Sequence, residues 1–158
     1  MGLTTPTDER AILTSFLDWD RAVVENKVRG LAVDEATRVA TPTGVTLLGI
    51  VAHLTVVEAR WFRHHLMGDL DVPPSEGSFT ADPTLSVEEV VAAYRTECER
   101  SQEITAELSL DHMSVIPQKH MGTVNLRYVL THMTEETGRH LGHMDVLREM
   151  TDGQVSDG

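Results

Sequence analysis

The segment His132–Arg148 reads HMTEETGRHLGHMDVLR, and it has the period of a helix. Together with the residues just before it, the segment places side chains at steps of three and four on one face, the spacing of an amphipathic helix. That face comprises Val129, Met133, Glu136, His140, Met144 and Leu147. Glu136 and His140 are one turn apart, so their Cβ atoms are expected about 6 Å from each other. A carboxylate and an imidazole are costly to bury unless something compensates them, and a divalent metal ion is one such partner.

Three further amphipathic stretches precede this helix. The apolar spacing predicts helices over about 8–28, 45–67, 86–110 and 123–150. Their expected N-caps are Thr7 for the first, Ser86 with Glu89 as a capping box for the third, and Thr123 for the fourth. A short helical turn is expected between the first two helices, and the connection 68–85 between the second and third contains three prolines. This order predicts an all-α protein, a four-helix bundle in which the long second connection can cross the length of the bundle.

Composition narrows the classes of function. The chain has 158 residues, 41% hydrophobic and 24% charged, as expected for one globular domain over 1–158 with a core at about 8–150. A net charge of −12 disfavours nucleic acid and anionic membranes as partners. No apolar run reaches the roughly 18 residues of a membrane helix, and the N-terminus lacks a signal-peptide pattern. The single cysteine, Cys98, excludes an internal disulfide, is expected to be a buried apolar residue and fits a cytoplasmic location.

A third ligand must come from another helix. Of the eight histidines, only His53 lies inside a helix other than the one that carries Glu136, since His64 and His65 are at a helix end and His112 and His120 are in a connection. If the second and fourth helices are antiparallel, the position of His53 along its helix matches that of His140. If they are parallel it matches His132, and the pair His132/Glu136 would be used instead. The apolar stripe favours His140, because His132 lies on the flank of that stripe.

Two histidines with one carboxylate form an open metal site, which leaves a coordination position free for water or substrate. Zinc fits such a site, and nickel or iron also fits, so the metal is not fixed by the ligand types. A di-iron bundle would need Glu-x-x-His pairs, which are absent at these positions, and a zinc protease would need His-Glu-x-x-His. His143 is a candidate catalytic residue for proton handling next to the metal. Trp19 and Trp61 are expected to fill the core.

Two segments resemble a known family. TLLGIVAHLTVVEARWF (46–62) and LRYVLTHMTEETGRHLGHMDVLREMTDG (126–153) are similar to the DinB-like metalloenzyme superfamily, in particular to its actinobacterial branch. The resemblance covers nearly the whole chain and implies an up-down-down-up bundle, in which the second and fourth helices are antiparallel. The family's ligand positions match His53, Glu136 and His140, and this ligand set is similar to that of the metal-binding domain of mycothiol-dependent maleylpyruvate isomerases.

The resemblance also implies a function. It implies a metal-dependent thiol S-transferase, with zinc as the expected metal, that activates mycothiol or a similar small thiol for attack on an electrophile. A homodimer is expected. Two alternatives stay open at this point: an isomerase or hydrolase on the same metal site, and a non-catalytic dimeric bundle that acts in binding or in a stress response.

Overall fold

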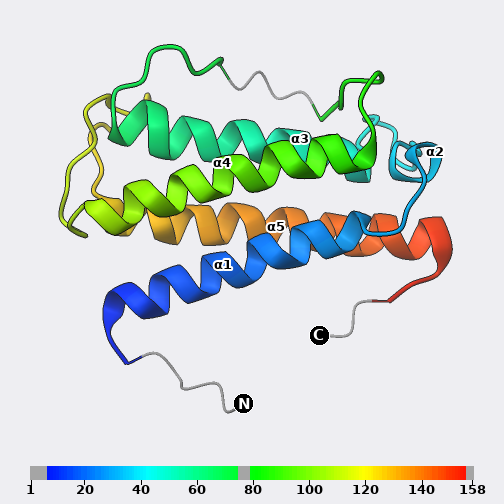
Figure 1. Ribbon diagram of the computed structural model, residues 1–158, viewed down its shortest axis with the longest axis horizontal. Helices are drawn as coiled ribbons and strands as arrows, with labels where there is room; N and C mark the ends of the chain where they lie inside the picture. The colour runs from blue at the N-terminus through cyan, green and yellow to red at the C-terminus, as the bar shows by residue number, and fades with distance from the viewer. Residues whose placement is uncertain (1–6, 75–78, 156–158) are drawn as a thin grey trace.

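The computed structural model describes residues 7–74 and 79–155, and in them the chain forms an all-α bundle. Its elements are α1 (Glu9–Val28), the short α2 (Val33–Ala36), α3 (Leu47–Glu58) continued by the π-helix η1 (Ala59–Leu66), α4 (Val87–Glu107) and α5 (Leu126–Asp152). Figure 1 shows α1 and α5 running in one direction and α3 and α4 in the other, which confirms the up-down-down-up order. The connection from η1 to α4 returns along the length of the bundle, as its length predicts.

The helix ends confirm one predicted cap and correct two. Ser86 accepts a hydrogen bond from the Glu89 amide, and the Glu89 carboxylate accepts one from the Ser86 amide, so the capping box is present. The first helix is capped by Asp8 rather than Thr7. The last is capped by Asn125 rather than Thr123. Both corrections have the same reason, since several polar residues near a helix start can cap it and only the backbone path selects one.

The sequence pattern predicts one uniform α-helix for the second long helix, but the structure differs. The helix changes to π geometry at Ala59 and keeps it to Leu66. A π turn pairs residues five apart, so Trp61 and Leu66 both face the core, and both are buried. Periodicity over a few turns does not separate the two helix types, which is why the sequence did not reveal the change.

The core consists of two apolar clusters. One is built around Val24, Leu54 and Met144, and the other around Leu17, Val57 and Met133. Along α1 and α5 the change from one cluster to the other coincides with buried ionisable residues: Arg21 in α1, Glu136 and His140 in α5. The apolar core is therefore interrupted near its middle by a belt of polar side chains, and the candidate site belongs to this belt.

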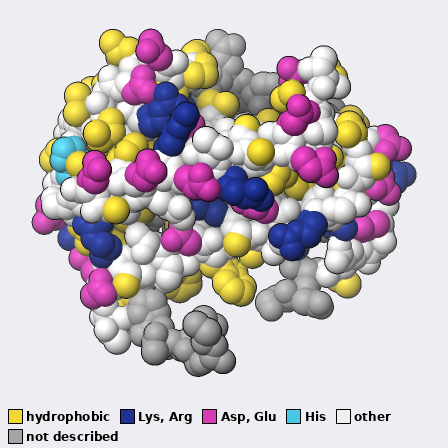
Figure 2. Space-filling view, in the orientation of Figure 1, with side chains coloured by type: hydrophobic (Ala, Val, Ile, Leu, Met, Phe, Trp, Pro, Cys, Tyr) yellow, Lys and Arg dark blue, Asp and Glu magenta, His cyan; other side chains and the backbone are white. Residues whose placement is uncertain are grey.

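Three more expectations from the sequence concern buried residues, surface charge and membrane helices. Cys98 and Trp61 are buried as expected, but Trp19 is 67% exposed, because α1 turns that side away from the other helices. Figure 2 shows acidic side chains spread across the visible face, with basic side chains between them rather than in one continuous basic area. In the described part of the chain, no helix combines the length and the apolar character needed to cross a bilayer.

Candidate metal centre

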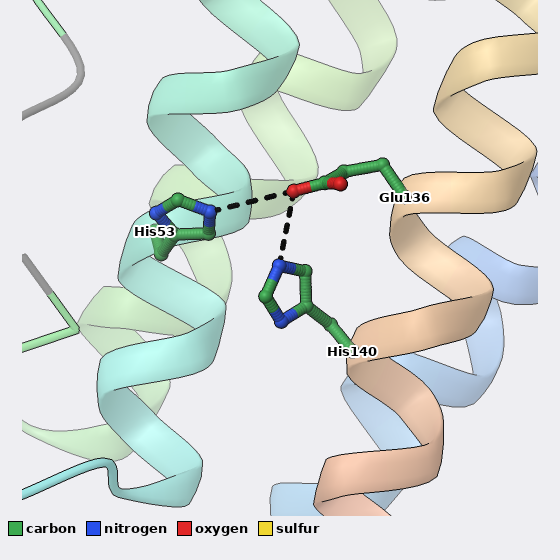
Figure 3. A group of neighbouring side chains, drawn as sticks. All are labelled: His53, Glu136 and His140. Carbon is green, nitrogen blue, oxygen red and sulfur yellow. Dashed lines mark hydrogen bonds and ion pairs between the residues drawn. The ribbon is translucent and has the colours of Figure 1, made fainter. Parts of the chain in front are cut away.

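Three side chains from two helices meet at the predicted site. His53 extends from α3, while Glu136 and His140 extend from successive turns of α5 (Figure 3). The three residues offer ligand atoms that all lie within 4.8 Å of one another. Glu136 Oε1 is the shared atom, 3.0 Å from His140 Nε2 and 3.7 Å from His53 Nε2. Because α3 and α5 are antiparallel, His53 lies at the same level of the bundle as Glu136 and His140, as their positions along the predicted helices indicate.

His132, the alternative ligand, lies outside this group. Its ring packs against Trp61, with 4.3 Å between the ring centroids, and stacks on Tyr128. Burial lowers the pKa of His132, although the nearby Glu136 carboxylate opposes the shift. His132 therefore belongs to an aromatic cluster beside the site.

The surroundings of Glu136 keep its carboxylate ionised. Hydrogen bonding from His140, together with the approach of His53, holds the pKa of Glu136 far below its usual range, although burial opposes this. The Arg139 guanidinium donates to Oε2, the oxygen that does not face the histidines. One carboxylate oxygen is thus held at the rim by an arginine, and the other is directed at two imidazoles.

The donor set fits a divalent cation. Nitrogen and oxygen ligands of a tetrahedral zinc site, about 2.0–2.2 Å from the metal, lie about 3.4 Å from each other. The distances from Glu136 Oε1 to the two imidazole nitrogens, 3.0 and 3.7 Å, bracket that value. Nε2 of His140, Nε2 of His53 and Oε1 of Glu136 face one another, and the lone pairs of such atoms are what a divalent cation binds. His140 Nδ1, the ring nitrogen that does not face Glu136, is buried and has no hydrogen-bond partner among the described residues.

His143, predicted as a proton-handling residue, is not one of the three grouped residues. It is exposed, and its ring centroid is 5.8 Å from that of His140. The structure thus places it next to the site on the solvent side, and its role stays a prediction.

Sequence reasoning missed a second buried charged group, the ion pair of Arg21 and Glu58. Arg21 Nε donates to Glu58 Oε1 at 2.8 Å, and Nη2 donates to Oε2 at 2.7 Å. Burial works against the charge on Arg21, but the Glu58 carboxylate outweighs it and raises the pKa of Arg21. A signal was available, because Arg21 follows Leu17 by four residues and Glu58 follows Leu54 by four, so each stands on an apolar stripe.

Comparison with known proteins bears on the identity of the site. No curated protein matches the chain. A family model does match: the model described as mycothiol-S-transferase aligns with residues 12–153, a span that includes all three clustered residues. This agrees with the DinB-like resemblance and with the bundle that the structure shows. The chain belongs to the mycothiol-S-transferase family.

Proposed function

We propose that this protein is a metal-dependent mycothiol S-transferase that binds a divalent cation, zinc by preference, through His53, Glu136 and His140. The observation that carries the proposal is that ligand atoms of these three side chains lie within 4.8 Å of one another, with Glu136 and His140 buried and His53 partly buried. Membership of the mycothiol-S-transferase family supports the thiol as the cosubstrate. Nickel and iron fit the same ligand types, so the metal itself is a matter for measurement.

The ligand set suits thiol activation. A bound cation lowers the pKa of a coordinated thiol, so that sulfur reacts as the thiolate. The protein contributes one negative charge, that of Glu136, against the two positive charges of the ion. The remaining positive charge favours an anionic sulfur over a neutral ligand. Because the three protein ligands leave a position free, a thiol can bind without displacing any of them.

Neighbouring side chains support this chemistry. Arg139 holds Glu136 Oε2 and thereby leaves Oε1 directed at the histidines. His143 is exposed near His140, where an imidazole can accept the proton that the thiol releases. The electrophilic substrate, a homodimer and a cytoplasmic location stay predictions.

The test combines metal analysis with a transfer assay. Protein purified without a histidine tag should contain close to one equivalent of divalent metal, and the His53→Ala variant should contain almost none. His120→Ala is a matched control, because His120 is exposed in the connection between α4 and α5. Loss of His53 with full metal content retained would contradict the ligand assignment.

The reaction type is tested on the same preparations. Wild-type protein should accelerate the conjugation of mycothiol to an aryl halide, with a rate that depends on both thiol and metal. Conversion of an ester or amide at a rate independent of thiol would support a hydrolase instead. Wild-type protein that is purified without metal, takes up none when zinc is added and is inactive toward both substrates would support the non-catalytic bundle.

A further inference from the structure

The connection between η1 and α4 is pressed against α3 at a glycine. A Cβ atom added to Gly49 would lie 1.7 Å from the carbonyl oxygen of Phe79 and 2.5 Å from its carbonyl carbon. No side chain fits in that space, so the absence of one at Gly49 allows the backbone of the connection to touch the helix. Gly49 is one turn before His53, and the contact therefore occurs beside the metal centre.

This contact places the Phe79 ring on both candidate histidine ligands. The ring centroid of Phe79 is 4.2 Å from that of His53 and 5.4 Å from that of His140. Phe79 is half-buried and also packs against the apolar cluster that contains Leu54 and Met144. The ring is thus supported by the core on one side and contacts the two imidazoles on the other.

We propose that Phe79 is a specificity-determining residue that makes the site prefer a sulfur ligand to water. The proposal rests on the function proposed above. An aromatic ring offers no conventional hydrogen bond to a water molecule on the ion. A water beside the Phe79 ring would therefore lose hydrogen-bond partners that it has in bulk solvent. A thiolate sulfur needs fewer hydrogen bonds, and contacts between sulfur and an aromatic ring are favourable. The wall that Phe79 forms therefore disfavours water more than it disfavours a thiol.

The position of the ring is tested on the metal-free protein by NMR. Phe79→Ala should shift the imidazole C–H proton resonances of His53 and His140, because the ring current of a neighbouring aromatic is lost, and should leave those of His120 unchanged. Phe16→Ala is the matched control, since Phe16 lies on the exposed side of α1. Unchanged resonances of His53 and His140 in Phe79→Ala would overturn the inference.

Ligand preference is tested with cobalt in place of the native metal and 2-mercaptoethanol as the probe. The sulfur-to-cobalt absorption band reports thiol binding. Phe79→Ala should keep its cobalt but bind the thiol roughly tenfold more weakly, the size of one lost aromatic contact. Phe79→Leu should lie between this variant and the wild type, and Gly49→Ala should resemble Phe79→Ala because it displaces the backbone at Phe79.

Two results would count against the proposal in different ways. Equal thiol affinity in wild type and Phe79→Ala, with the band present in both, would overturn the role of Phe79 and leave the proposed function standing. Absence of the band in cobalt-loaded wild type would overturn both, because no thiol would then reach the metal.

Discussion

The polar belt of the bundle contains two groups of buried charges, and they are built differently. In the pair of Arg21 and Glu58, both carboxylate oxygens accept from the guanidinium, and the third nitrogen, Nη1, donates to Asp18 at 2.9 Å. Glu58 is only 1% exposed. In the candidate metal centre, one oxygen of Glu136 faces two imidazoles, and the other accepts from Arg139.

The contrast separates a structural ion pair from a ligand site. A bidentate arginine neutralises the charge of a carboxylate, and a guanidinium has no lone pair with which to bind a metal. The imidazoles that face Glu136, in contrast, can bind a metal through their nitrogens, and the carboxylate can be a further ligand. Burial and charge alone are therefore a poor guide to function, and the kind of side chain that faces the carboxylate distinguishes the two sites better.

The largest effect on stability is expected from breaking the ion pair. Arg21→Met leaves the Glu58 carboxylate buried without its cation, and the expected loss is about 3–5 kcal/mol in the free energy of unfolding. Urea denaturation measures it. The double variant Arg21→Met/Glu58→Met should recover most of the loss, because neither charge then remains. A single variant as stable as wild type would mean that the pair does not contribute as its geometry indicates.

A smaller effect, dependent on metal, is expected at the candidate metal centre. Zinc at about 100 times its dissociation constant should stabilise the wild type by about 2.7 kcal/mol. His53→Ala should show almost none of this gain, and Arg21→Met should still show it, although its baseline is lower. Thermal unfolding with zinc and with chelator measures both. Equal zinc stabilisation in wild type and His53→Ala would remove the distinction between the two groups of charges.

A third effect is expected from His65, which belongs to neither group. Burial lowers the pKa of His65, with contributions from the positive charges of His64 and Arg60, while a hydrogen bond to the Ile116 carbonyl opposes the shift. Below its usual pKa of about 6.5, the unfolded chain therefore binds a proton that the folded chain resists, so stability falls as the pH decreases through that range.

Urea denaturation of the metal-free protein between pH 7.5 and 5.5 measures this dependence. His65→Gln should flatten the profile, whereas His120→Gln, at an exposed position, should leave it unchanged. A profile identical to wild type in His65→Gln would show that other groups cause the dependence.

The smallest effect is expected outside the polar belt. Trp19 is mostly exposed on α1, so Trp19→Gln should change the free energy of unfolding by no more than about 0.5 kcal/mol. The same urea titration measures it. A loss of several kcal/mol would mean that this side chain is covered in solution.

The sequence predicted much of the fold and of the site. The four long helices follow from apolar periodicity, and each of their spans was found to within a few residues. His53 was singled out because the other two histidines of its predicted helix, His64 and His65, lie at the helix end, and the structure brings His53 together with Glu136 and His140. The predicted caps at Thr7 and Thr123 were wrong, as was the burial of Trp19.

Features that depend on local pattern could be predicted from the sequence, and features that depend on long-range contacts could not. Helix spans, the ionisable residues on apolar stripes and the three candidate ligands can be read from spacing, because each depends on residues a few positions apart. The pairing of Arg21 with Glu58 and the position of Phe79 on two imidazoles depend on residues brought together from different parts of the chain. Spacing within one helix contains no information about which residue of another helix it will meet, so only the packed bundle could show which buried carboxylate pairs with an arginine and which faces two imidazoles.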